Sequence, residues 1–139
     1  MPQDFMTDQE KILRKLLAKR ILFMDGAMGT MIQQHKLTEE DYRGGSDGRF
    51  AKFSAPKGQR ELFLKGNNEL LSLTQPQIIQ SIHEAYLEAG SDIIETNTFG
   101  ATEIAQDDYA MSDLAYEMNV ASAKLARQAV DKFSTKEKP

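Results

Sequence analysis

The chain has 139 residues, the size of one ordinary domain, and its 40% hydrophobic and 27% charged residues are normal for a soluble globular protein. Its net charge of −4 argues against the basic surface that nucleic-acid binding requires. The sequence contains no apolar run of about 18 residues that could span a membrane and no apolar leader at its N-terminus. We therefore expect a cytoplasmic protein that binds neither nucleic acid nor membranes.

The chain contains no cysteine, which excludes disulfide bonds and thiolate metal ligands from these residues. His35 and His83 are its two histidines, and they fall in different predicted helices without a partner at metal-ligand spacing. We interpret both as partly exposed helix side chains. No metal is therefore expected to bind to this chain alone.

An amphipathic helix is predicted over residues 7–20. Thr7 and Glu10 fit a capping box, in which each side chain satisfies a backbone N–H group that the helix leaves free. Leucine and isoleucine residues then recur at helical spacing, surrounded by lysine and arginine residues. This pattern predicts a helix that packs one apolar face against an apolar surface.

A buried parallel strand is predicted over residues 21–24, because four apolar residues are followed directly by turn residues. The strand leads into Asp25 and a loop that contains Gly26 and Gly29, with a short helix over residues 28–34. Ligands of parallel α/β folds bind at the carboxyl ends of strands, which makes Asp25 a candidate site residue. The glycines complete neither a dinucleotide-binding motif nor a P-loop, and from this stretch alone a plain turn is an equally good interpretation.

The least regular part of the sequence lies between residues 36 and 64. A loop of this length in a compact domain is unusual unless it is functional or mobile, so residues 43–59 are predicted to form a flexible loop. Residues 65–68 (KGNN) have the composition of a structured turn. A helix is predicted to begin at Thr74 as its cap and to end at Gly90.

A second strand is predicted over residues 92–97, and it also ends in polar residues. A short helix follows near residues 103–109, and a long helix that begins at Ser112 has an apolar stripe that would pack on the sheet. This order of elements predicts an α/β fold built from two βα units. Two strands make a poor sheet, and the sequence stops where a third strand would be due, so we expect the N-terminal part of a larger domain.

The two strand ends together predict one binding site. Adjacent parallel strands end at the same edge of a sheet, about 4.8 Å apart, which would bring an acid, backbone N–H groups and polar side chains together. A carboxylate beside N–H donors suits a zwitterion such as an amino acid. The predicted site residues are Asp25, Gly26, Ala27, Met28, Glu95, Thr96, Asn97 and Thr98.

Three motifs resemble the N-terminal homocysteine-binding domain of the cobalamin-dependent methionine synthases, and they occur in the same order. They are residues 25–31 (DGAMGTM), 65–68 (KGNN) and 95–99 (ETNTF). The resemblance extends from about residue 20 to about residue 132, apart from residues 45–62. The first motif alone would also fit other homocysteine methyltransferases, including betaine-dependent ones.

The resemblance implies an incomplete (β/α)8 TIM barrel, of which this chain would supply the first two βα units after an N-terminal helix. In the family, homocysteine binds through its sulfur to a zinc ion held by three cysteines. The thiolate takes a methyl group from methylcobalamin, which 5-methyltetrahydrofolate recharges, and becomes methionine. By position, Asp25 would bind the amine of homocysteine, Gly26 and Ala27 would bind its carboxylate through their N–H groups, and residues 95–97 would line the pocket floor.

The zinc-binding cysteines are absent from this chain. The resemblance therefore implies the N-terminal part of a methionine synthase that is inactive alone and binds neither zinc nor cobalamin by itself. Its partners would be homocysteine and the remaining barrel strands and the cobalamin and folate domains of the full-length protein. The alternatives are a non-catalytic module that binds an amino acid or a partner chain, and a fragment of a betaine-type homocysteine methyltransferase.

Overall fold

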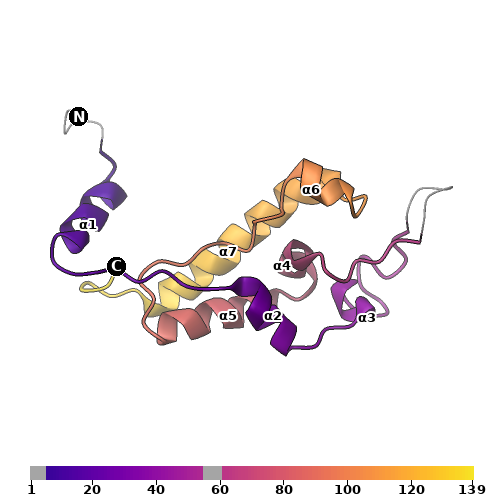
Figure 1. Ribbon diagram of the computed structural model, residues 1–139, viewed down its shortest axis with the longest axis horizontal. Helices are drawn as coiled ribbons and strands as arrows, with labels where there is room; N and C mark the ends of the chain where they lie inside the picture. Colours follow the sequence, from indigo (N-terminus) through magenta and orange to yellow (C-terminus); the bar gives the residue numbers. More distant parts are fainter. Residues whose placement is uncertain (1–5, 55–60) are drawn as a thin grey trace.

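The computed structural model describes residues 6–54 and 61–139, and helices dominate this part of the chain (Figure 1). In chain order the elements are α1 (Asp8–Leu17), α2 (Met28–Gln34), α3 (Glu39–Tyr42), the 3₁₀ helix η2 (Asn68–Leu70), α4 (Leu71–Thr74), α5 (Pro76–Glu88), α6 (Glu103–Asp107), the 3₁₀ helix η3 (Ser112–Leu114) and α7 (Ala115–Phe133). Within the described residues, no helix combines the length and the apolar character that crossing a bilayer requires.

The predicted α/β fold is wrong: residues 6–54 and 61–139 contain no β-sheet, and so neither of the two βα units of an incomplete (β/α)8 TIM barrel. The two apolar segments do lie side by side and parallel, but a single β-bridge between Met24 and Ile93 joins them. The Asp25 N–H donates to the Ile93 carbonyl at 2.9 Å, and the Ile93 N–H donates to the Phe23 carbonyl at 3.1 Å. The sequence therefore identified two neighbouring segments but not their secondary structure.

The physical reason lies in what covers these segments. Ile21, Phe23 and Met24 expose 76%, 64% and 56% of their surface, so the apolar run is not buried. Two paired strands are marginally stable in water unless further strands or a packed helix cover a face. Without that cover, the bridge does not extend into a ladder.

The core lies between helices instead. The long helix α7 packs against α5, and α4 packs against both (Figure 1). The prediction that α7 packs on a sheet is therefore also wrong, although its apolar stripe is real and buries Met118 and Leu125. The core residues with at most 2% exposure include Ile32, Leu64, Leu70, Leu71, Ile79, Ile82, Met111 and Met118.

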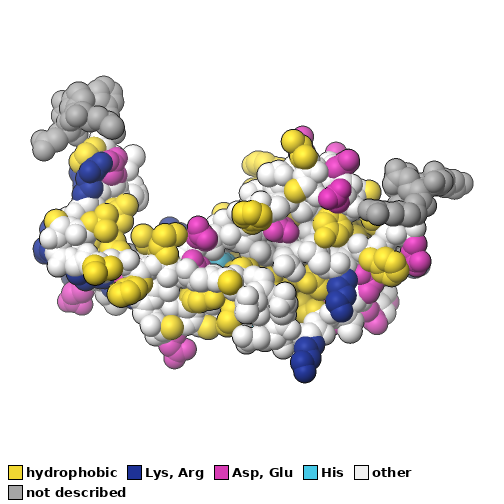
Figure 2. Space-filling model, in the orientation of Figure 1, with side chains coloured by type: hydrophobic (Ala, Val, Ile, Leu, Met, Phe, Trp, Pro, Cys, Tyr) yellow, Lys and Arg dark blue, Asp and Glu magenta, His cyan; other side chains and the backbone are white. Residues whose placement is uncertain are grey.

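Helix α1 begins where the sequence predicts. Thr7 is its N-cap, and the Thr7 hydroxyl accepts a hydrogen bond from the Glu10 N–H at 3.2 Å. The expected packing is not observed, because α1 stands apart from the other helices (Figure 1) and has no buried residue. Apolar side chains gather over α1 and the segment that follows it (Figure 2), and Leu17 is 55% exposed.

Part of the predicted flexible loop is described by the structure, namely residues 43–54, whereas residues 55–59 lie outside the described part. In the described part, the Arg43 guanidinium donates to the carbonyl groups of Phe53 at 2.6 Å and Leu62 at 2.9 Å. These bonds connect Arg43, at the start of the predicted loop, to Phe53 within it and to Leu62 beyond it. The predicted flexibility of the loop stays a prediction.

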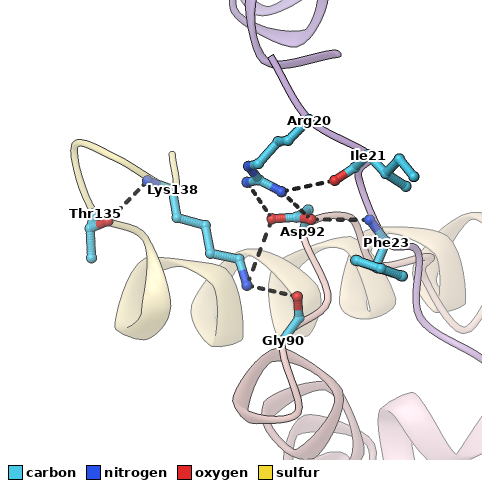
Figure 3. A network of polar contacts seen from close by, with 7 residues as sticks. All are labelled: Arg20, Ile21, Phe23, Gly90, Asp92, Thr135 and Lys138. Carbon is cyan, nitrogen blue, oxygen red and sulfur yellow. Dashed lines mark hydrogen bonds and ion pairs between the residues drawn. The ribbon is translucent and has the colours of Figure 1, made fainter. Parts of the chain in front are cut away.

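A network of polar contacts connects the bridge region to the C-terminal residues (Figure 3). The Arg20 guanidinium donates two hydrogen bonds to the Asp92 carboxylate, both at 2.8 Å, and the Phe23 N–H donates to it at 3.0 Å. The Lys138 ammonium lies 3.7 Å from Asp92 Oδ1 and donates to the Gly90 carbonyl at 2.9 Å. The hydrogen bonds from Arg20 hold the pKa of the Asp92 carboxyl well below its usual value.

The contribution of Asp92 to stability is expected to disappear in acid. Its pKa is lower in the folded state than in the unfolded chain, so its stabilisation is present above about pH 4 and decreases as the pH falls below that value. Asp92→Asn should therefore lower the urea midpoint at pH 7 and make the midpoint depend less on pH in acid. Urea unfolding at several pH values measures both effects.

Asp131→Asn is the matched control, because it removes an exposed ion pair with Arg127 at 3.4 Å. It should leave the urea midpoint at pH 7 nearly unchanged. An Asp92→Asn variant with the same acid sensitivity as the original chain would contradict the prediction.

Candidate functional site

A hollow of about 460 Å³ opens where the chain leaves the bridge between Met24 and Ile93. Three stretches line it, residues 25–29, 68–69 and 95–99. The structure brings together all eight predicted site residues, which are Asp25, Gly26, Ala27, Met28, Glu95, Thr96, Asn97 and Thr98. Their shared location follows from the structure, whereas their binding of a ligand stays a prediction.

Sequence reasoning missed four of the residues that line the hollow, namely Gly29, Asn68, Glu69 and Phe99. Asn68 belongs to the KGNN motif, whose composition is that of a structured turn. Phe99 lies two residues after the predicted strand end, and its side chain is fully exposed. The signal that could have found these residues was their place in or beside the three motifs.

Asp25 is the acidic residue of the hollow that follows the bridge directly. Its Oδ2 atom accepts a hydrogen bond from the Glu95 N–H at 3.1 Å, while its Oδ1 atom is buried and meets no donor in the described part of the chain. Burial raises the pKa of Asp25, and the hydrogen bond from Glu95 opposes this. Most buried polar atoms in proteins have a hydrogen-bond partner, so a buried acceptor without a donor, such as this Oδ1 atom, is unusual.

The turn after Asp25 supplies backbone donors. The N–H groups of Gly26, Ala27 and Met28 meet no acceptor in the described residues. The Tyr86 hydroxyl, from α5, donates to the Ala27 carbonyl at 3.3 Å and supports the turn. A Cβ atom at position 26 would lie 3.2 Å from the Tyr86 hydroxyl, so glycine there lets the tyrosine pack closely.

The lining of the hollow carries one sign of charge. Asp25, Glu69 and Glu95 are acidic, and no lysine, arginine or histidine is found among the described residues that line it. Such a lining attracts the ammonium group of a zwitterion. Because it offers no basic side chain, a ligand carboxylate would have to bind to backbone N–H groups.

The histidines lie outside this hollow. His35 is exposed, as predicted, at the end of α2. The prediction of partial exposure is wrong for His83, because it is fully buried in α5, its ring nitrogens have no partner in the described part, and burial lowers its pKa. In that part of the chain, no group of three histidine, cysteine, aspartate or glutamate side chains could hold a metal ion. The zinc site that the family resemblance implies therefore does not fit these residues.

The sequence model of the homocysteine S-methyltransferase family matches residues 22–138 and so includes all three stretches that line the hollow. The chain is therefore a member of a methyltransferase family. In particular, it belongs to the homocysteine S-methyltransferases, which confirms the resemblance drawn from the three motifs and supports a role in homocysteine methylation.

Proposed function

We propose that the hollow binds homocysteine and that the chain is the amino-acid-binding portion of a methionine synthase. The observation that carries this proposal is the buried Asp25 Oδ1 atom without a donor beside a turn with free N–H groups. The ammonium of homocysteine would donate to Asp25, and Gly26 and Ala27 would donate to its carboxylate. Residues 95–97 would line the floor.

Methylcobalamin, recharged by 5-methyltetrahydrofolate, is the proposed source of the methyl group. The support is the resemblance of the KGNN and ETNTF motifs to the cobalamin-dependent type rather than to the betaine-dependent type. In the reaction, the homocysteine sulfur gains the methyl group and the product is methionine. Cobalamin and folate domains are the proposed partners.

Activation of the thiol requires groups that this chain does not supply. The chain has no cysteine, and its described residues offer no cluster for zinc. We therefore propose that these residues recognise homocysteine but do not methylate it without a further polypeptide that activates the thiol.

Calorimetric titration with L-homocysteine tests the binding proposal. Saturable binding of L-homocysteine and L-methionine is expected, because both carry the same ammonium and carboxylate groups. Absence of saturable binding at millimolar concentrations would contradict the proposal. Formation of methionine by the chain alone with methylcobalamin would contradict the proposed inactivity.

A partner-binding module is the second candidate, because Ile21, Phe23 and Met24 form an exposed apolar surface. This candidate expects no amino-acid binding, but association that Phe23→Lys prevents. Sedimentation analysis of both proteins, beside the titration, separates the two functions.

A further inference from the structure

We propose that Ser72 and Ser122 are positioning residues of this site. Together with Asn97 they close a ring of hydrogen bonds that fixes the wall formed by residues 95–99 relative to the wall formed by residues 68–69. The inference rests on the proposed homocysteine site. Neither serine is among the residues that line the hollow, so each would act through Asn97.

Asn97 lies where the two walls meet. It lines the hollow but is only 5% exposed. Its Nδ2 atom donates to the Asn68 carbonyl at 2.8 Å and to the Ser72 hydroxyl at 3.3 Å, which uses both amide hydrogens. The opposite orientation of the amide would place Oδ1 against the Asn68 carbonyl, so these contacts determine which way the side chain points.

The directions of the remaining hydrogen bonds follow from counting protons. The Ser122 hydroxyl donates its one proton to the backbone carbonyl of Asn97 at 3.1 Å. In the 2.7 Å contact between the serine hydroxyls, Ser72 must therefore be the donor. The ring thus runs from the side-chain Nδ2 of Asn97 to Ser72, from Ser72 to Ser122, and from Ser122 back to the backbone carbonyl of Asn97.

This ring is buried and is anchored on the helical core. Ser72 is 3% exposed and lies in α4, and Ser122 is fully buried and lies in α7. Helices α4 and α7 pack together. Hydrogen bonds in such a network strengthen one another, and a missing member leaves its neighbours without a partner away from water.

The ring fixes the acceptor that Asn97 presents to a ligand. Both Nδ2 hydrogens are used, and no donor in the described part of the chain meets its Oδ1 atom. Oδ1 is therefore the side-chain atom of Asn97 that a ligand ammonium could reach. Opening the ring would loosen the wall that carries Asn97, while the Asn68 carbonyl would still accept from its Nδ2 atom.

A second set of contacts joins the same two walls further along the chain. The Gly100 N–H donates to the Glu69 carboxylate at 2.9 Å, and the Gly100 carbonyl accepts from Gln106 at 2.9 Å. The segment is therefore held on both sides of Phe99, and loss of the serine ring should release only its Asn97 end. This predicts a local effect rather than global unfolding.

The decisive variants are Ser122→Ala, Ser72→Ala and the double variant, with Ser91→Ala as the matched control. Ser91 is also buried, at 7% exposure, but it does not line the hollow. Each ring variant should weaken the binding of L-homocysteine about threefold to tenfold in calorimetry, as expected for the loss of one well-placed contact. The double variant should lose no more than the larger single loss, because one missing member already opens the ring.

Amide hydrogen exchange without ligand gives a readout that does not depend on binding. Residues 95–99 should exchange faster in both single variants but not in Ser91→Ala, while α7 stays protected. If the original chain fails to bind homocysteine, the proposed function fails, and the exchange experiment still decides whether the ring exists. Unchanged exchange in this segment, or original affinity in a folded Ser122→Ala or Ser72→Ala variant, would overturn the inference, as would strictly additive losses in the double variant.

Discussion

Asp25→Asn is expected to lower the affinity of the chain for L-homocysteine by about tenfold to 100-fold at pH 7, because a hydrogen bond to a charged group is lost. Asparagine keeps the shape of the side chain and can still accept from the Glu95 N–H. It removes the negative charge that the ligand ammonium would meet. Calorimetric titration of both proteins measures the difference.

The pH dependence of binding provides a second readout of the same group. Burial raises the pKa of Asp25, so the charged form is lost at a higher pH than for an ordinary aspartate. Homocysteine affinity should therefore decrease as the pH falls through that raised pKa, and Asp25→Asn should lose this dependence. The raised pKa also means that the charged Asp25 destabilises the folded state at pH 7, so the variant should not unfold more easily.

A ligand without the amine is the control for this prediction. 4-Mercaptobutyrate retains the thiol and the carboxylate but has no amine for Asp25 to bind, so its affinity should not fall in Asp25→Asn and should rise if anything, because one negative charge leaves the lining. An Asp25→Asn variant that binds homocysteine as tightly as the original chain would contradict the assigned role of Asp25. Equal losses for homocysteine and 4-mercaptobutyrate would show instead that the turn had been disturbed.

Several local signals in the sequence predicted local structure, although the predicted cap Thr74 is wrong, because Thr74 ends α4 and the N-cap of α5 is Gln75. Thr7 caps α1 as expected, and α2 begins and ends at the predicted residues. Gly90, the predicted helix stop, follows α5 with a φ of 113°, a conformation that favours glycine. These features depend on a few neighbouring residues, so the sequence alone is sufficient to predict them.

Features that depend on what covers a segment could not be predicted in the same way. The run at residues 21–24 has the composition of a buried strand, yet it is largely exposed and forms one bridge. His83 looks like a surface residue in sequence but is buried. The ring that includes Ser122 and Asn97 joins positions 25 residues apart through tertiary packing, and no spacing rule indicates it.

The eight predicted site residues nevertheless lie together in space, around one hollow. Their shared location requires only that residues 25 and 93 lie side by side, which the hydrogen bond from the Asp25 N–H to the Ile93 carbonyl shows. A complete sheet is not required for this. The location of the hollow was therefore predictable even though the fold class was not.

Gln106→Leu is expected to lower the free energy of unfolding by about 3 kcal/mol, because both amide groups of the buried Asn67 and the partly buried Gly100 carbonyl lose their partner. The amides of Gln106 and Asn67 donate to each other at 2.7 and 3.1 Å, and both residues are at most 1% exposed. Gln106 also donates to the Gly100 carbonyl at 2.9 Å. Leucine fills a similar volume but satisfies none of these groups. Urea unfolding followed by circular dichroism measures the loss.

The double variant Asn67→Leu/Gln106→Leu distinguishes loss of a partner from loss of packing. An unpaired buried amide costs more than the removal of both amides, so the double variant should be more stable than the sum of the two single losses predicts. Gln128→Leu, at an exposed position of α7, is the control and should change stability little. Additive single losses, or a loss below about 1 kcal/mol for Gln106→Leu, would show that this amide pair contributes little beyond its packing.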